Sequence, residues 1–178
     1  DDLLGLPLKL MADHADVRAL LRDAFANKGE VATSVVKGKE TERTKFEDYY
    51  DYREAAEDIP SHRFLAIRRG ETEGVLRLKI EVDPDPLLPR LQANMGLNPA
   101  SPWAPVMREA CEDAFKRLLA PSVETDVRVD LKLRADREAV DVFAENLKHL
   151  LLAAPLGQRA VVGVDPGLRT GCKLAAVD

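Results

Sequence analysis

Hydrophobic residues recur at helical spacing along much of the chain. Residues 16–27 carry apolar side chains on one face and are followed by Gly29, so a helix is expected to end there. A second helix is expected over residues 60–70, because the proline that leads it suits a first helical turn. The same spacing continues through residues 107–119 and 123–133. The pattern therefore predicts a mainly α-helical, multi-helical region.

The second half of the chain is expected to form separate helices. Pro121 should end one helix and let another begin, because proline cannot continue the hydrogen-bond ladder. Asp136 is expected to cap a further helix with a strong apolar stripe, which ends near Pro155. Residues 127–133 also alternate as a strand would, but the apolar side chains of 123–133 stack four residues apart, so the segment is interpreted as helix.

One short, isolated strand is expected among these helices. Residues 75–82 alternate apolar and polar side chains, which is typical of a half-buried strand. The proline-rich residues 83–89 then break the strand and are expected to form a loop or hinge. Residues 37–45 mix basic and acidic side chains, and they are interpreted as the exposed face of a helix.

The chain closes with a predicted β-hairpin. Residues 160–164 form an apolar run without alternation, which is typical of a strand buried on both faces. A turn rich in proline and glycine follows, and residues 172–177 can return antiparallel to the first strand. Asp165 therefore stands at a strand end above a tight turn.

Three interpretations of Asp165 remain open from this stretch. In ribonuclease-H-like folds an aspartate on the first strand helps to hold paired divalent cations, which need carboxylates on rigid backbone. In actin-like nucleotidases an Asp-x-Gly turn offers backbone N–H groups to phosphate. The third interpretation is a plain hairpin turn with no ligand.

The net charge of the chain argues against non-specific binding of nucleic acid. The 178 residues carry a formal net charge of −5, so binding to phosphates would need a local basic patch. The best candidates are Arg63, Arg68 and Arg69, although arginines near the end of a helix also interact favourably with the helix dipole. Lys37 and Lys39, with tyrosines nearby, are further candidates, but neighbouring acidic residues offset their charge.

The remaining composition points to a reducing compartment. The 46% hydrophobic content is enough for a real core, and Cys111 and Cys172 fit neither a disulfide framework nor a zinc spacing. A cytoplasmic location without a membrane span is therefore expected, because no apolar run approaches about 20 residues. The start at Asp1, without methionine or signal peptide, suggests a piece of a longer protein.

Four segments carry a resemblance to a known family. They are KGKETERTKFEDYYDY (37–52), IPSHRFLAIRRGETEGVLRLKI (59–80), AFKRLLAPSVETDVRVDLKLRADREAVDVFAENLKHLLLAAPLG (114–157) and GVDPGLRTGCKLAAVD (163–178). In this order, and over nearly the whole chain, they resemble the bacterial Tex family of transcription accessory proteins. In that family a helical central region leads into a YqgF-type, ribonuclease-H-like domain, followed by helix-hairpin-helix segments and an OB-fold RNA-binding domain.

The resemblance implies a domain organisation and a set of partners. Residues 1–156 would be a Tex-like central helical region, truncated at its N-terminus, and residues 157–178 the first two strands of a ribonuclease-H-like α/β domain. Asp165 matches the first acidic position of that domain, which could take a divalent metal when complete. The fragment itself is expected to hold no catalytic residue and no cofactor. Nucleic acid, RNA or DNA, is the expected partner of the full-length protein, with RNA polymerase or the ribosome as possible protein partners.

Three functions are consistent with the sequence. The leading hypothesis is a helical scaffold within a nucleic-acid-binding transcription accessory protein. The second is part of a metal-dependent nuclease or resolvase, which would need further carboxylates on later strands. The third is a protein-interaction module that docks on the transcription or translation machinery, for which an exposed apolar face would be evidence.

Overall fold

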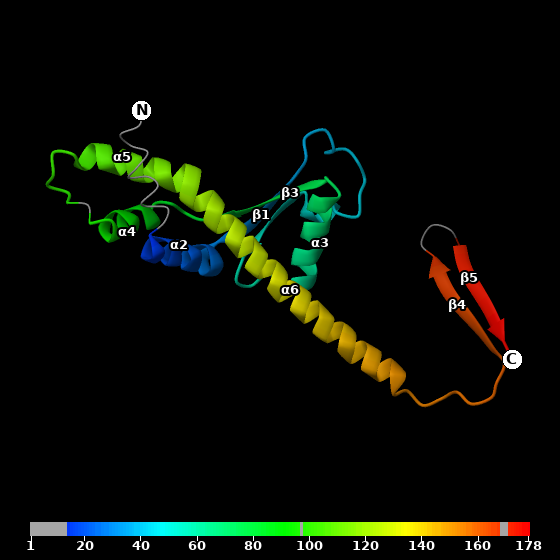
Figure 1. Ribbon diagram of the computed structural model, residues 1–178. Helices are drawn as coiled ribbons and strands as arrows, with labels where there is room; N and C mark the ends of the chain where they lie inside the picture. The colour runs from blue at the N-terminus through cyan, green and yellow to red at the C-terminus, as the bar shows by residue number, and fades with distance from the viewer. Residues whose placement is uncertain (1–13, 97, 168–170) are drawn as a thin grey trace. The chain divides into compact units, whose positions relative to one another are not determined.

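The structure is a computed structural model that describes residues 14–96, 98–167 and 171–178. The chain divides into two compact units, Asp1–Val140 and Asp141–Asp178. The elements, in chain order, are α2 (Ala15–Lys28), β1 (Glu30–Val35), the 3-10 helix η1 (Glu47–Tyr49), β2 (Asp51–Ala55), α3 (Ser61–Thr72), β3 (Leu76–Glu81), α4 (Leu87–Asn94), α5 (Ala104–Ala114), the π-helix η2 (Phe115–Leu119), α6 (Ala120–Leu151), β4 (Val161–Gly167) and β5 (Gly171–Val177) (Figure 1).

The expected helices near residues 16–27 and 60–70 are confirmed as α2 and α3, and the expected strand over 75–82 is confirmed as β3. The strand is not isolated, however. β1, β2 and β3 form an antiparallel sheet in the order β2-β1-β3. The prediction missed β1 and β2 because neither alternates cleanly: three consecutive residues of β1 are buried, and β2 is mostly charged.

The inner face of the sheet packs on the helices of the first unit. Leu76, Leu78 and Ile80 of β3 are buried, while the residues between them are exposed. In the register of the sheet, Val31 of β1 lies between Glu54 and Ile80. The largest fully buried side chains come from the sheet and from every helix from α2 to α6, and they are Phe64, Leu21, Ile67, Leu76, Leu91, Leu119, Val17, Val31, Val123, Val127 and Cys111.

The charged segment 37–45 does not form a helix. It is a turn-rich connection between β1 and β2, in which Gly38 takes a positive φ of 93°. The N–H of Gly38 donates to the Glu40 carboxylate at 2.7 Å, and the Tyr50 hydroxyl donates to the carbonyl of Glu42 at 2.7 Å. Such local bonds offer the backbone an alternative to a helix, which explains why the helical interpretation was wrong.

The helices of the second half run into one another without a break. The structure confirms that residues 123–133 are helical and begins α6 at Ala120, beside Pro121, but no non-helical residue separates α6 from η2, and Asp136 lies inside α6. Pro121 lies in the first turn of α6, and it has no N–H to donate to the carbonyl four residues back. The chain adapts by a π-turn, in which the N–H of Ala120 donates to the carbonyl of Phe115. Asp136 caps no helix and instead pairs with Lys132 at 2.5 Å.

The second unit contains the end of α6 and the predicted hairpin, which is confirmed. β4 and β5 pair antiparallel, with Asp165 opposite Lys173. Both faces of the hairpin are exposed in this chain, so the burial expected for residues 160–164 is not observed: Val162 is 64% exposed and Val164 is 59% exposed. Two paired strands cannot bury either face by themselves, and such a hairpin is marginally stable alone.

No helix in the described ranges is both long enough and apolar enough to cross a bilayer.

Candidate functional site

The arginines predicted to contact phosphate all lie on α3, but they point toward different partners. Each has a carboxylate partner: Arg63 pairs with Glu54 of β2 at 3.0 Å, and Arg69 pairs with Glu73 at 2.9 Å. Arg68 pairs with Glu71. Because successive residues of a helix point about 100° apart, α3 does not gather the three side chains into one basic patch.

Arg63 belongs to a polar cluster at the edge of β2. Its guanidinium also donates to the hydroxyl of Tyr52 at 3.4 Å, and that hydroxyl in turn donates to the carboxylate of Glu54. Burial and, to a lesser extent, the bond to Glu54 raise the pKa of Tyr52. The ring of Tyr52 meets Tyr49 edge to face at 5.4 Å. Tyrosines that could have stacked on bases are therefore used within the fold.

Arg69 shares its carboxylate partner with a residue of the β1–β2 connection. Glu73 accepts from Lys45 at 2.8 Å and from Arg69 at 2.9 Å. The hydrogen bond from Lys45 and then that from Arg69 lower the pKa of Glu73 below its usual value. These bonds tie the connection to the end of α3.

The lowered pKa of Glu73 leads to a prediction about the stability of the fold at low pH. A depressed carboxyl pKa contributes stability above the unfolded-state value, and that contribution is lost as pH falls through the folded-state value. The wild-type chain should therefore lose more stability than Glu73→Gln between about pH 6 and about pH 3. Urea unfolding of both proteins at the two pH values measures this difference. An equal loss in both proteins would show that the pairing does not contribute.

Lys37 and Lys39 lie in the connection between β1 and β2. Lys37 is exposed and Lys39 is half-buried. The backbone N–H of Lys39 donates to the carbonyl of Val36 at 3.0 Å and closes a turn. Within the described ranges, neither ammonium group has a carboxylate within ion-pair distance, so these are the predicted site residues whose charge stays available.

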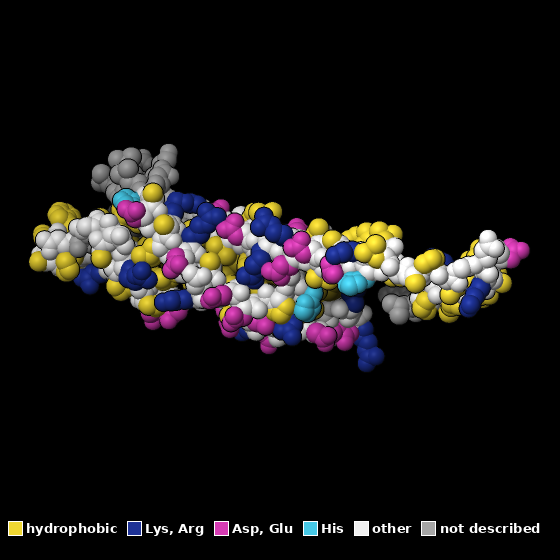
Figure 2. All heavy atoms as spheres, turned by 90° about the horizontal axis from the view of Figure 1, so that it is seen from below, with side chains coloured by type: hydrophobic (Ala, Val, Ile, Leu, Met, Phe, Trp, Pro, Cys, Tyr) yellow, Lys and Arg dark blue, Asp and Glu magenta, His cyan; other side chains and the backbone are white. Residues whose placement is uncertain are grey.

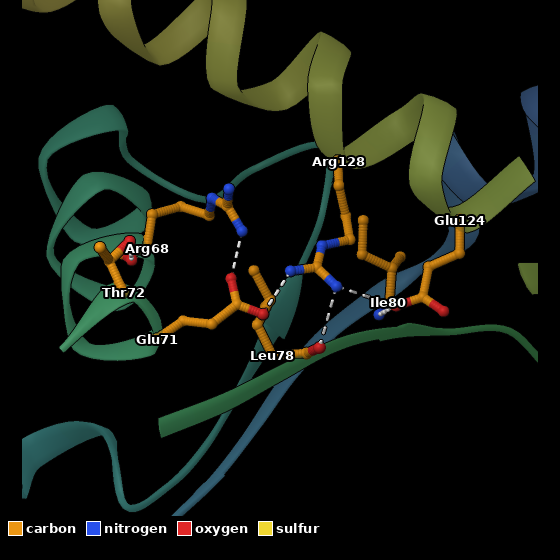
Figure 3. Close-up of polar contacts among 7 residues, drawn as sticks. All are labelled: Arg68, Glu71, Thr72, Leu78, Ile80, Glu124 and Arg128. Carbon is orange, nitrogen blue, oxygen red and sulfur yellow. Dashed lines mark hydrogen bonds and ion pairs between the residues drawn. The ribbon is translucent and has the colours of Figure 1, made fainter. Parts of the chain in front are cut away.

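A polar network that the sequence did not reveal joins α3, β3 and α6 (Figure 3). Glu71 accepts from both Arg68 and Arg128, so one carboxylate serves two guanidinium groups. Arg128 also donates to the carbonyl of Leu78 at 3.4 Å, and Glu124 accepts from the N–H of Ile80 at 3.1 Å. Two side chains of α6 thereby cover backbone groups on the open edge of β3.

The sequence held only a weak signal for this network. Glu124 and Arg128 are four residues apart on a helix, which is the spacing of a local ion pair. Their partners on α3 and β3 are more than forty residues away, at separations of 57 for Glu71 and 44 for Ile80. Only the folded chain brings these groups together.

A pocket of about 300 Å³ opens next to the network, in the first unit. Its wall contains one residue of α3 and five of α6, and they are Arg68, Thr125, Arg128, Val129, Lys132 and Leu133. The wall thus combines three basic side chains, one hydroxyl and two apolar side chains.

Asp165, the candidate metal ligand, lies on β4 in the second unit. Its carboxylate is exposed and lies 4.0 Å from the ammonium group of Lys173 on β5. Across the described parts of the chain, no three His, Cys, Asp or Glu residues come together in a way that could hold a metal ion. Within these residues the structure therefore brings no further metal ligands to Asp165.

Basic and acidic side chains are interspersed on the face of the molecule that Figure 2 shows. Together with the network, this defines a helical unit built on a small antiparallel sheet, whose charged groups mainly join its own elements. The family model described as Tex central region-like matches residues 8–143. The chain therefore belongs to the Tex family.

Individual relatives agree with this assignment. Over 94% of the chain, 37% of residues are identical to "Protein tex" of Bordetella pertussis. Over the whole chain, 38% are identical to the "Transcriptional accessory protein Tex" of Neisseria gonorrhoeae. Over 79% of the chain, 34% are identical to the human "S1 RNA-binding domain-containing protein 1". The chain spans 23% and 24% of the two bacterial relatives and 15% of the human one.

Proposed function

We propose that this chain is the helical scaffold segment of a Tex-like transcription accessory protein and adds little nucleic-acid affinity of its own. One observation carries the proposal: Arg63 and Arg69 of α3, which could have met phosphates, are paired with carboxylates of the same unit. Side chains committed to internal pairs stabilise the arrangement of helices and strands, and a phosphate backbone would have to compete with those carboxylates.

The second half of α6 supplies a surface for the scaffold role. Phe143 is 66% exposed, and Leu147, Leu150 and Leu151 are exposed as well. A helix normally packs such an apolar stripe against another element. In the proposal, these residues contact other parts of a Tex-like protein, and those parts bind nucleic acid, RNA or DNA. The name of the human relative, which mentions an S1 RNA-binding domain, supports RNA as one partner.

The hairpin fits the start of a YqgF-type, ribonuclease-H-like domain. In this proposal residues 1–156 are the central helical region and residues 157–178 are the first two strands of that next domain. Asp165 would be the first acidic position, and later strands would have to bring the remaining carboxylates for a divalent metal. Free thiols at Cys111 and Cys172 suit the reducing cytoplasm, where we place the protein.

The exposed stripe on α6 also favours a second candidate function, docking on RNA polymerase or the ribosome. Exposed apolar patches mark protein-interaction sites as well as packing sites between domains. A protein partner should then lose affinity when Phe143 and Leu147 are both replaced by Ser. Unchanged co-purification of polymerase or ribosomes with that variant would exclude docking through this face.

The scaffold proposal is tested by removing two of the paired arginines. Arg63→Gln with Arg69→Gln should lower the urea midpoint of unfolding, because Glu54 loses its ion pair with Arg63 and Glu73 keeps Lys45 but loses Arg69. The affinity for single-stranded RNA, measured by fluorescence anisotropy, should change less than about twofold, since neither side chain is free to contact phosphate.

The matched control for this experiment is Lys37→Gln with Lys39→Gln. These side chains have no carboxylate partner in the described structure, so the variant should keep its urea midpoint. Should the Arg63 and Arg69 variant lose tenfold or more in RNA affinity while keeping its midpoint, α3 would be a nucleic-acid-binding surface and the scaffold proposal would fail.

A further inference from the structure

The pocket beside α6 has a basic wall, although the chain as a whole carries a negative net charge. Its basic residues are Arg68, Arg128 and Lys132, and no carboxylate contributes to the wall. The nearest carboxylates are engaged outside the wall. Glu71 is shared by the two arginines, and Asp136 pairs with Lys132 at 2.5 Å. A ligand in the pocket would therefore meet three cations whose carboxylate partners lie outside the wall, and it would compete with those carboxylates.

Carboxylates face these cations from each neighbouring element. Glu71 comes from α3, and Glu124 and Asp136 come from α6. Glu124 lies 3.9 Å from the guanidinium of Arg128, and it also accepts the N–H of Ile80 at 3.1 Å. The same carboxylate is thus divided between two donors, and the arginines keep unused hydrogen-bonding capacity.

A second observation concerns Arg68 itself. Its Nε is buried and has no hydrogen-bond partner, although the Nη1 of the same guanidinium donates to Glu71. A buried donor without a partner is costly, and such a group in a folded protein calls for an explanation. A guanidinium presents its donors as a planar fork that matches the two oxygens of an oxyanion. A small rotation of the Arg68 side chain toward the pocket would let these donors bind an oxyanion there.

The apolar part of the wall limits the class of ligand. Val129 is 53% exposed and Leu133 is 59% exposed, and both lie on the same face of α6 as Arg128 and Lys132. A volume of about 300 Å³ is at the small end of ligand pockets. The space fits one charged group together with a compact organic substituent.

We propose that this pocket binds a phosphate group, with Arg68, Arg128 and Lys132 around the oxygens and the organic substituent on Val129 and Leu133. The hydroxyl of Thr125 donates to the carbonyl of Pro121 at 2.9 Å. Its oxygen can still accept a hydrogen bond from a donor group on the substituent. The ligand chemistry is that of a nucleotide, either free or within a single strand. This binding site goes beyond the scaffold function, which requires no ligand.

The arginine Nε–H signals in ¹H–¹⁵N spectra test the proposal directly. The probes are inorganic phosphate, uridine monophosphate and a single-stranded RNA of about ten nucleotides. Arg68 and Arg128 should shift on titration, while Arg69, which is not in the wall, should not. Uridine monophosphate should bind more tightly than inorganic phosphate. Tighter binding of the RNA than of the mononucleotide identifies the polymer as the source, and the reverse identifies a free nucleotide.

Two variants are expected to change the affinity for uridine monophosphate in opposite directions. Arg68→Gln should weaken uridine monophosphate binding about tenfold, since a hydrogen bond to a charged group is lost. Glu71→Gln should strengthen it several-fold, because the carboxylate that competes for both guanidiniums is neutralised. Arg69→Gln is the matched control on the same helix and should bind as the wild type does. If Arg68→Gln does not fold, as judged by circular dichroism, Lys132→Gln takes its place with the same expected loss.

The pocket would be rejected by either of two results. One is the absence of any Arg68 or Arg128 shift with all three probes at millimolar concentration. The other is equal affinity of the wild type and the Arg68 or Lys132 variant. Both results would leave the scaffold proposal standing, because that proposal is tested on Arg63 and Arg69, outside the pocket.

Discussion

Replacing Phe64 with alanine is expected to lower the free energy of unfolding by about 3–5 kcal/mol. The ring of Phe64 is 1% exposed and belongs to the core of the first unit. Its removal takes a large apolar side chain out of the core and leaves a cavity between α3 and its neighbours. Urea or thermal unfolding of the wild type and the variant measures the difference.

The neighbouring residue supplies the control for this prediction. His62 is exposed on the same helical turn, so His62→Ala should change stability by no more than about 0.5 kcal/mol. If both variants unfolded at the same denaturant concentration, α3 would not be anchored through Phe64. The helix would then be free to act as a surface element, contrary to the scaffold account.

Gly29→Ala is expected to cost about 2–3 kcal/mol, for a reason of space and not of backbone strain. Gly29 joins α2 to β1 with a φ of −71°, which any residue can adopt. A methyl group there would overlap the carbonyl oxygen of Phe25, and it would lie 2.9 Å from the Cγ2 atom of Ile80. The backbone of α2 and β1 would have to move apart, since a carbonyl cannot rotate away as a side chain can.

Gly74 offers the opposite case. It has a φ of +69° and open space around the position of a Cβ atom. Gly74→Ala should therefore cost only the strain of a left-handed residue, about 1 kcal/mol. Thermal unfolding of both variants separates the two causes. A larger loss for Gly74→Ala than for Gly29→Ala would contradict the close approach of α2 and β1.

The helices and the hairpin could be predicted because their signals are local. The apolar residues of α2 and α3 repeat at helical spacing, and the proline before α3 marks its start. Gly167 ends β4 and Gly171 begins β5, and Gly171 has a φ of +78°, which suits a glycine next to a hairpin turn. Such features depend on residues a few positions apart, which the sequence displays directly.

The sheet could not be predicted because its stability comes from distant partners. β2 is mostly charged, and it is a strand because Tyr52 and Glu54 stand opposite residues of β1. The continuity of α6 was missed for a related reason. Pro121 and Asp136 are local stop and start signals, yet buried residues on both sides, such as Leu119 and Val123, hold the helix together across the proline.

The candidate site shows the same limit. The sequence identified Arg63, Arg68 and Arg69 as a basic cluster, because it places no acidic residue among them. The fold supplies Glu54 from β2, while Glu71 and Glu73 come from the end of α3. Arg128 shares Glu71 with Arg68, and it lies 57 positions from Glu71 in the sequence. Charge along a sequence therefore overstates the charge that a folded surface presents.

We expect that the paired charges of Arg63 and Arg69 stabilise the fold of this chain and do not hold nucleic acid. Fluorescence anisotropy of labelled single-stranded RNA and duplex DNA, titrated with the whole chain at about 50 mM and about 200 mM salt, tests it most directly. Weak binding is expected at both concentrations, with a change in affinity of no more than about threefold, as for a single phosphate contact. Tight binding at the lower salt that falls by about a hundredfold or more at the higher salt would show several phosphate contacts and contradict the account.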